Sequence, residues 1–268
     1  MREYICAMKW IDTHAHMYLP QFDEDRAEWV SRAKREGLTH VFLPNIDIES
    51  IPQMENLVAS DSSFFIPMMG LHPCDVKENY EEVLDAMESK WNTNEYVAVG
   101  EIGIDLYWDK STLEIQKKAF HRQIEWAIAK DKPIVIHARD AFEEIFEVLD
   151  TFHDEKLRGI FHCFTGTLAH AKKIMSYNTF FFGIGGVLTY EKSGLDKVVS
   201  EIPLEKMVLE TDSPFLSPKP YRGKRNECSY IPIIGQKLAL VKNIALHTVA
   251  EVTTKNALHI FDVVKSDV

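Results

Sequence analysis

Short apolar segments recur along the chain, separated by longer stretches in which apolar residues repeat with helical spacing. The apolar segments are continuously hydrophobic, which is typical of parallel strands covered on the outside by helices. The candidate strands span residues 9–16, 40–46, 64–72, 96–105, 133–139, 158–164, 179–188 and 206–212. They recur at intervals of roughly 25–35 residues, which leaves room for a helix or crossover after each.

The intervening stretches carry the signals of helix ends. Helices are expected over residues 24–37, 111–133, 229–244 and 247–261. The first ends at Gly37, a residue type favoured just after a helix. The second has an apolar stripe, Ser111 or Thr112 as its N-cap and Pro133 just beyond its end.

Eight strands, each followed by a helix or crossover, predict an α/β protein with a TIM-type (β/α)₈ barrel, regular or distorted. We expect a single domain over residues 1–268, because no linker, repeat or low-complexity block marks a boundary. A doubly wound open sheet is the alternative. Its dinucleotide-binding version is unattractive because no GxGxxG turn follows the first strand, and GIGG at 183–186 is too short to replace it.

Composition narrows the class of protein. No apolar run approaches the roughly 18–20 residues that span a membrane, and the N-terminus lacks signal-peptide features, so we expect a cytoplasmic protein. The cysteines Cys6, Cys74, Cys163 and Cys228 form no CxxC pair and are expected to be reduced. The net charge of -11 argues against a broad basic nucleic-acid surface. It leaves open a phosphodiester substrate at one site made positive by bound cations.

Titratable residues end several of the apolar segments. His14 and His16 are two apart in the first segment and should point to one side of the strand. The other members are Glu101, His137, His162 and Asp212, each at the carboxyl end of its own segment. A barrel brings these ends to one face, where barrel active sites lie.

An isolated HxH is often an ordinary hydrogen-bonded pair, but six such groups at five strand ends favour a metal site, because buried acids and histidines need partners. Imidazole and carboxylate suit zinc, manganese, iron or nickel, with magnesium less natural. Six ligands exceed a tetrahedral set, so we expect two divalent metal ions with Glu101 as the bridge.

Seven motifs carry a family resemblance. They are DTHAH (12–16), GLHP (70–73), GEIGID (100–105), IHAR (136–139), FHCFTG (161–166), ETDSPFL (210–216) and RGKRNE (222–227). Their order and spacing resemble the TatD family of metal-dependent deoxyribonucleases, within the wider amidohydrolase-like group. The resemblance implies a TIM barrel, cations held by the six residues above, and hydrolysis of DNA phosphodiester bonds from the 3′ end. Cys228 stands where the family usually has proline, and Ile104 where leucine is usual.

Catalytic roles are expected for Asp212 and Glu101. Asp212 is our candidate general base, since it can accept the proton of an attacking water. Glu210, two residues earlier, is expected to hold a neighbouring ligand or to be a structural acid. His72 is a candidate donor to a phosphate oxygen, with packing as the alternative.

Other candidate substrate contacts lie on loops. Asp105 and Arg139 are expected to orient groups at the site, with a surface ion pair as the alternative for Arg139. The basic loop 217–227 is expected to bind phosphate, and the resemblance singles out Arg222 and Asn226. The remaining basic residues of this loop are Lys219, Lys224 and Arg225, and two aromatic residues, Tyr107 and Trp108, either stack on a base or pack at the rim.

Two other functions remain open. The first is hydrolysis of a small ester, lactone or amide, but many such binuclear barrels use a modified lysine as the bridge, and the fourth strand here offers Glu101. The second is a non-catalytic metal-binding protein, which the intact ligand set disfavours. For the nuclease we expect weak, salt-sensitive binding of single-stranded DNA or 3′ ends, because duplex affinity grows with each phosphate neutralised. No obligate protein partner is evident.

Overall fold

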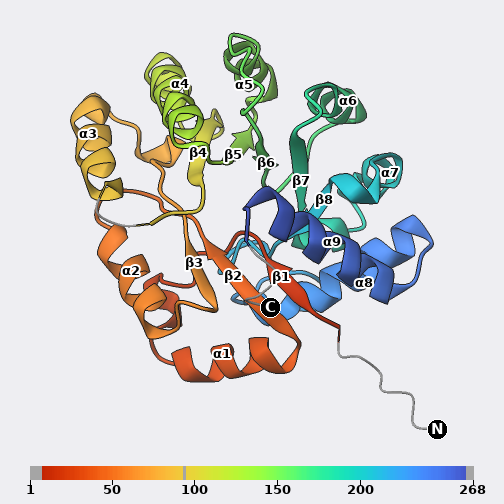
Figure 1. Cartoon of the computed structure of the whole chain (residues 1–268). Helices are drawn as coiled ribbons and strands as arrows, with labels where there is room; N and C mark the ends of the chain where they lie inside the picture. The colour runs from red at the N-terminus through yellow and green to blue at the C-terminus, as the bar shows by residue number, and fades with distance from the viewer. Residues whose placement is uncertain (1–7, 93–94, 264–268) are drawn as a thin grey trace, which may run out of the picture.

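The computed structural model describes residues 8–92 and 95–263, in which a ring of helices surrounds eight strands (Figure 1). The strands are β1 (Trp10–Asp12), β2 (Leu38–Leu43), β3 (Phe65–Pro67), β4 (Val99–Asp105), β5 (Ile134–Arg139), β6 (Gly159–Phe161), β7 (Phe180–Ile184) and β8 (Met207–Leu209). The helices are α1 (Arg26–Arg35), α2 (Ile51–Ser60), α3 (Tyr80–Trp91), α4 (Leu113–Lys130), α5 (Phe142–Leu149), α6 (Leu168–Ser176), α7 (Leu195–Glu201), α8 (Ile231–Lys242) and α9 (Leu246–Ile260). All eight predicted strands are therefore present.

The strands pair in parallel and in chain order, β1 to β3 in one sheet and β4 to β8 in another. Backbone hydrogen bonds join the two sheets at both seams. Between β3 and β4, the Met69 N–H donates to the Ala98 carbonyl at 3.1 Å, and between β8 and β1 the Thr13 N–H donates to the Leu209 carbonyl at 3.0 Å. The ring is closed, so the TIM-barrel prediction is confirmed and the open-sheet alternative is wrong.

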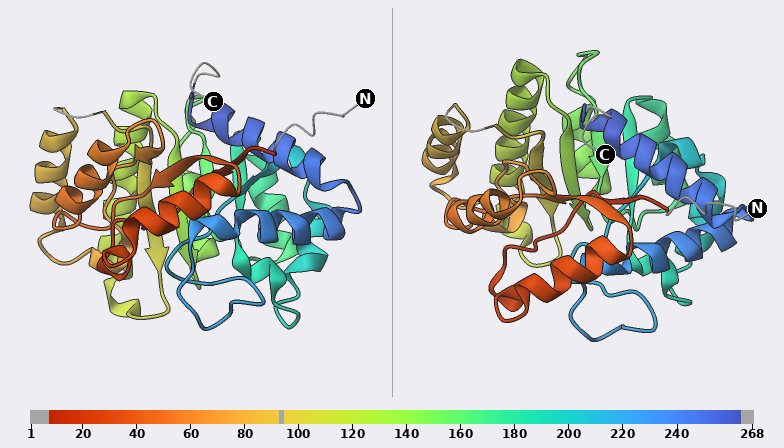
Figure 2. Two further views of the ribbon diagram at one scale, coloured as in Figure 1. Left: turned by 90° about the horizontal axis from the view of Figure 1, so that it is seen from below. Right: turned by 60° about the horizontal axis from the view of Figure 1, so that its bottom comes forward.

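An apolar layer fills the barrel at the amino-terminal side of the site. It takes one residue from each strand or its flank, namely Ile11, Phe42, Met68, Ala98, Val135, Ile160, Phe181 and Val208. The end of α9 packs against this layer, and the rings of Phe42 and Phe261 stack with centroids 4.0 Å apart. Figure 2 (left) shows α9 at one end of the barrel and the loop that follows β8 at the other. One end is thus sealed by hydrophobic packing, and the other carries the loops.

Six of the eight strands end earlier than the apolar pattern predicts, whereas β4 and β5 end at Asp105 and Arg139, as predicted. The predicted ligands that lie just beyond their strands are His14, His16, His162 and Asp212. Glu101 and His137 lie within β4 and β5. The prediction that all six ligands lie on strands is therefore wrong for His14, His16, His162 and Asp212. The reason is visible at Asp212, which adopts a left-handed conformation with φ of 57° that no regular strand permits.

Helix ends follow the expected chemistry only in part. Gly37 has φ of 87°, and its N–H donates to the Lys34 carbonyl at 3.1 Å, so it ends α1 as predicted. Thr112 is the N-cap residue of α4, as predicted, but its side chain makes no capping hydrogen bond. A short 3₁₀ turn precedes the helix, and the Asp109 carboxylate accepts the Ser111 N–H at 2.8 Å.

Two further expectations concern the chain as a whole. No described helix is long and apolar enough to cross a membrane. Cys74, Cys163 and Cys228 are free thiols, as expected, while Cys6 lies outside the described residues.

Candidate metal centre

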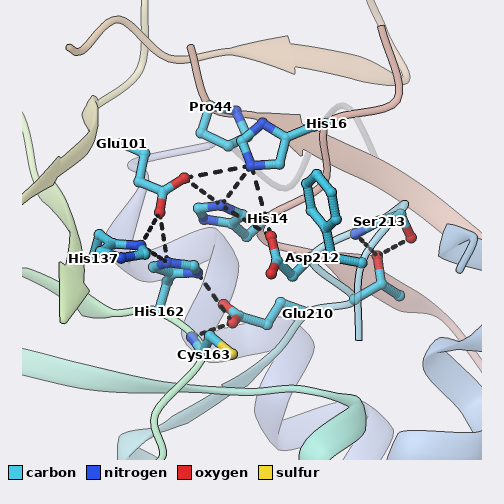
Figure 3. A network of polar contacts seen from close by, with 12 residues as sticks. His14, His16, Pro44, Glu101, His137, His162, Cys163, Glu210, Asp212 and Ser213 are labelled. Atoms are coloured by element: carbon cyan, nitrogen blue, oxygen red, sulfur yellow. Dashed lines mark hydrogen bonds and ion pairs between the residues drawn. The ribbon is translucent and has the colours of Figure 1, made fainter. Parts of the chain in front are cut away.

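His14 and His16 converge on one oxygen of Glu101 (Figure 3). His14 Nε2 lies 3.1 Å from Glu101 Oε2 and 3.3 Å from His16 Nε2, and His16 Nε2 lies 3.4 Å from the same oxygen. Asp212 Oδ1 faces both rings, 3.8 Å from His14 Nε2 and 3.6 Å from His16 Nε2. We call His14, His16, Asp212 and Glu101 Oε2 the first donor set.

The other oxygen of Glu101 faces a different pair of histidines. His137 Nδ1 and His162 Nε2 each lie 2.7 Å from Glu101 Oε1, and 3.3 Å from one another. These atoms form the second donor set. A single carboxylate thus places one oxygen in each set, which is the arrangement that a bridging ligand requires.

Neighbouring groups fix which ring nitrogens carry a proton. The Tyr18 hydroxyl donates its one hydrogen to the Pro44 carbonyl at 2.7 Å, so at 3.1 Å it can only accept from His16 Nδ1. His137 Nε2 lies 2.9 Å from the Asp105 carboxylate, which accepts its hydrogen. In the neutral form of both rings the inward nitrogens, His16 Nε2 and His137 Nδ1, are therefore lone-pair donors directed at Glu101.

The residues present fit divalent cations. In neutral rings, lone-pair nitrogens that face one another and a carboxylate have no hydrogen to share, and a cation between them would satisfy all of them. Among the described residues, groups able to hold an ion include His14 with His16 and Glu101, and His14 with His162 and Glu210. The buried His14 Nδ1, His162 Nδ1 and Glu210 Oε2 also have no hydrogen-bond partner. Imidazole with carboxylate suits zinc, manganese, iron or nickel.

Asp12, which sequence reasoning missed, ties the first donor set to the barrel seam. Its fully buried carboxylate accepts from the His14 N–H at 3.2 Å, the Thr211 N–H at 3.0 Å and the Thr211 hydroxyl at 2.5 Å. The backbone of His14 and that of Asp212 are also joined directly, by a hydrogen bond of 2.8 Å. The signal was an acid after an apolar run, two residues before the HxH pair.

Glu210 lies under the second donor set. Its Oε1 accepts the Cys163 N–H and is 3.6 Å from His162 Nδ1. Gly183 leaves space for it, because a Cβ there would come within 2.1 Å of Glu210 Oε2. Glu210 therefore contacts a candidate ligand from behind.

Burial and neighbouring charge separate the protonation states of the cluster. Burial lowers the pKa of His14 well below its usual value. For Glu101, burial alone would raise the pKa, but the surrounding His162, His72 and His14 hold it well below the ordinary range. Burial raises the pKa of Asp212 to about 6. The shared carboxylate of Glu101 is accordingly more firmly ionised than that of Asp212.

A cavity of roughly 630 Å³ extends from this cluster to the surface. Its lining includes Glu101, His162 and Asp212 at the buried end, and Arg139 and Trp108 at the exposed end. No lysine is among the described residues that line it. Five of the six predicted ligands thus line one cavity, with the fully buried His14 in contact with them, and the lining lacks the lysine that a carbamate bridge would need.

Comparison with known proteins identifies the family of the chain. The sequence model of the family described as TatD related DNase matches residues 11–262. The chain belongs to this TatD family. It is 38% identical over 251 residues to an uncharacterized metal-dependent hydrolase, YabD, of Bacillus subtilis, covering 93% of this chain and 98% of that one. It is 32% identical over 260 residues to the 3′-5′ ssDNA/RNA exonuclease TatD of Salmonella typhimurium, covering 94% and 99%.

A solved structure agrees with the family assignment. The TatD homologue YjjV of Escherichia coli superposes with a TM-score of 0.89 at 25% identity, covering 96% of this chain and all of that one. A TatD-family hydrolase of Entamoeba histolytica, at 22% identity and a TM-score of 0.84, has the same fold. The protein is therefore a metal-dependent hydrolase of the TatD family.

Three further predicted residues of the TatD motifs lie at the cavity. His72 Nδ1 accepts the Cys74 N–H at 3.1 Å, which leaves its hydrogen on Nε2, 3.4 Å from Glu101 Oε1. His72 is thus arranged as a hydrogen-bond donor. Asp105 contacts His137 as described. Arg139 makes no ion pair among the described residues, and its guanidinium lies 3.7 Å from the Tyr107 ring centroid.

The basic loop 217–227 is mostly occupied by contacts within the protein. Lys219 pairs with Glu191 at 2.9 Å and Arg225 with Asp25 at 2.6 Å. Arg222 makes no ion pair among the described residues and lies over Tyr190, 4.4 Å from its centroid. Of the four cations in this loop, only Arg222 and Lys224 are thus without an acidic partner in the described structure.

Asn226 lies away from the surface. Its side chain is fully buried, and its amide nitrogen donates to the Thr211 carbonyl at 2.7 Å and the Phe215 carbonyl at 2.6 Å. Both amide hydrogens are used in this way. Asn226 therefore holds the segment around Asp212 through these two bonds. Its side chain has no hydrogen left to donate to a substrate.

Proposed function

We propose that this protein is a two-cation phosphodiesterase that removes nucleotides from the 3′ end of single-stranded DNA. The observation that supports it most is the split of the Glu101 carboxylate between two donor sets, with Oε2 3.1 Å from His14 Nε2 and Oε1 2.7 Å from His162 Nε2. Cleavage of single-stranded nucleic acid is the activity named for the TatD relative of Salmonella typhimurium.

Each donor set would hold one divalent cation. His14, His16 and Asp212 would hold the first, His137 and His162 the second, and Glu101 would bridge them. Bound cations would supply a lowered pKa for water and would offset negative charge on phosphate oxygens. The second contacts of His16 and His137, to Tyr18 and Asp105, would keep the inward nitrogens free of hydrogen.

The remaining roles fall to groups that line the cavity. Asp212 is part exposed, at 14%, and is the carboxylate placed to accept a proton from an attacking water. His72 would donate from Nε2 to a phosphate oxygen, because its Nδ1 is occupied by the Cys74 N–H. Arg139 supplies a positive charge at the exposed end.

One assay separates this activity from hydrolysis of a small ester, lactone or amide. Purified protein loaded with manganese, magnesium or zinc is given 5′-labelled single-stranded DNA and, separately, a panel of small esters. We expect a ladder of products shortened from the 3′ end, abolished in Asp212→Asn. Ester turnover that depends on Asp212, with no cleavage of DNA under any cation, would contradict the proposal.

The donor sets have their own test, independent of activity. Metal content is measured for the wild type and for His14→Ala and His162→Ala, one variant from each set. We expect two cations per wild-type chain and a loss of one or more in each variant. Unchanged metal content in both variants would overturn the assignment of ligands.

A further inference from the structure

Exposed apolar side chains gather at the mouth of the cavity. The large hydrophobic residues that the described structure leaves exposed are Met8, Tyr107, Trp108, Leu168, Phe215, Leu216, Leu240 and Ile244. Three of them, Trp108, Phe215 and Leu216, line the cavity that leads to the donor sets. Trp108 is 71% exposed, although contact of its largely apolar indole ring with water is unfavourable. An aromatic ring kept in this position is suited to a planar apolar ligand.

The aromatic turn is fixed relative to the donor sets by one carboxylate. Asp105 Oδ1 accepts the Tyr107 N–H at 2.9 Å and the Trp108 N–H at 3.4 Å. The other oxygen of Asp105 accepts from His137 Nε2 at 2.9 Å. Asp105 itself is buried and ends β4, so the turn and the candidate ligand share one rigid anchor. A group stacked on Trp108 would be held at a set position relative to the second donor set.

A cation accompanies the aromatic surface. The Arg139 guanidinium lies 3.7 Å from the Tyr107 ring centroid and 5.5 Å from that of Trp108. Arg139 is exposed, lines the cavity and makes no ion pair within the described part of the chain. Its charge is therefore free for a phosphate, which guanidinium binds well. Aromatic face and free cation together are what single-stranded nucleic acid requires.

We propose that Trp108 is a stacking platform for the nucleobase beside the scissile phosphate, with Arg139 binding a phosphate of the same strand. This inference rests on the phosphodiesterase function proposed above. The recognised group would be an unpaired base. A base within a duplex is already stacked on both faces and cannot reach a side chain at the mouth of the cavity. Specificity for nucleic acid over a small ester would come from this platform, and the bond cleavage from the donor sets.

The test compares two 5′-labelled single-stranded oligonucleotides of equal length and charge. One has ordinary nucleotides throughout, and the other has base-free sugars at its last two 3′ positions. We expect the wild type to remove the base-bearing end about ten-fold more efficiently in kcat/KM, since stacking on one aromatic side chain has roughly that effect. Trp108→Ala should abolish the preference by slowing the base-bearing end alone, and Trp108→Phe should retain most of it.

A matched control removes another exposed apolar side chain far from the cavity. Leu240, 73% exposed on α8, is replaced in Leu240→Ala, and the preference should stay at the wild-type value. If Trp108→Ala slows both ends alike, or neither, the platform is overturned while the phosphodiesterase function stands. If the wild type cleaves neither oligonucleotide with any cation, the phosphodiesterase function fails and the platform falls with it.

Discussion

The barrel interior contains two adjacent layers with opposite chemistry. The lower layer is apolar, supplied by every strand in turn and sealed by α9. The upper layer, two to five residues further along the chain, consists of histidines and carboxylates whose nitrogen and oxygen atoms converge. The lower layer is held by apolar packing alone, whereas the donor types of the upper one suit a cation. The folded chain is thus stabilised by one layer and made reactive by the other.

The largest effect is expected from a substitution of Glu101, the residue that both donor sets of the upper layer share. In Glu101→Gln one carboxylate oxygen becomes an amide nitrogen, so one donor set loses its negative ligand atom and the other faces a hydrogen-bond donor. We expect the chain to lose at least one cation and activity to fall by at least about 10³-fold. Metal analysis and kcat/KM on single-stranded DNA measure the two effects.

The control for Glu101→Gln is a glutamate of the same charge on the surface. Glu143, 77% exposed on α5, serves in Glu143→Gln, which should match the wild type in both measurements. Full metal content together with full activity in Glu101→Gln would show that the bridging role is wrong.

The lower layer is tested by removing its stacked ring. Phe42→Ala deletes a fully buried side chain that stacks on Phe261 at 4.0 Å, so we expect a loss of about 3–5 kcal/mol in the free energy of unfolding. Cations bound per folded chain should not change, because no donor atom is removed. Urea unfolding and metal analysis give the two values.

Phe42→Leu serves as a milder control, because it keeps most of the buried volume and should lose clearly less stability. A loss below about 1 kcal/mol in Phe42→Ala would contradict the structural role of the layer. Loss of metal from the folded Phe42→Ala protein would show that the two layers are not separable.

The fold could be predicted from sequence because the lower layer makes a strong pattern. Continuous apolar segments at regular spacing indicated eight parallel strands, and all eight are present. Most strand ends could not be predicted: β1 and β8 stop at Asp12 and Leu209, whereas the predicted segments run on to residues 16 and 212. Beyond these ends the backbone makes hydrogen bonds across the seam, between Thr13 and Leu209 and between His14 and Asp212, which lie about two hundred positions apart.

The site divides in the same way. The six ligand candidates were predicted as a group because an unpaired histidine or acid beside a core is costly, and the structure brings all six together. Long-range contacts were out of reach: nothing local indicates that Pro44 accepts the hydrogen of the Tyr18 hydroxyl, or that Asn226 is buried under the segment around Asp212. Those contacts depend on the conformation of loops, which the periodic pattern of apolar residues does not predict.

Removing the metal should lower the free energy of unfolding by less than Phe42→Ala does and by more than Asp25→Asn, discussed below. If the cation is present at 100 times its dissociation constant, it stabilises the folded chain by about 2.7 kcal/mol, because the unfolded chain lacks the site. Urea unfolding with manganese or with a chelator measures this difference. It should be as large in Phe42→Leu as in the wild type, since the lower layer holds no ligand, and much smaller in Glu101→Gln. A wild type equally stable in both conditions would show that the upper layer needs no cation.

The smallest effect is expected outside both layers, where α1 anchors the loop that follows β8. Asp25 pairs with Arg225 at 2.6 Å and with Arg32 at 3.0 Å, and these bonds hold its pKa at about 2, below its ordinary value of 3.8. A lowered pKa means that the pair stabilises the fold above about pH 4 and ceases to do so as the pH falls through about 2. Because these groups are partly exposed, Asp25→Asn should cost at most about 1 kcal/mol at pH 7.

The decisive measurement for Asp25→Asn is the difference in free energy of unfolding between wild type and variant at pH 7, 5, 3 and 2. It should be constant down to about pH 4 and should vanish near pH 2, when Asp25 of the wild type becomes neutral as well. Glu24→Gln, which removes an adjacent acid that makes no ion pair among the described residues, should show no such trend. A difference that persists or grows at pH 2 would mean that the anchor acts through packing. In that case the loop 217–227 beside the upper layer would depend on packing contacts, as the lower layer does.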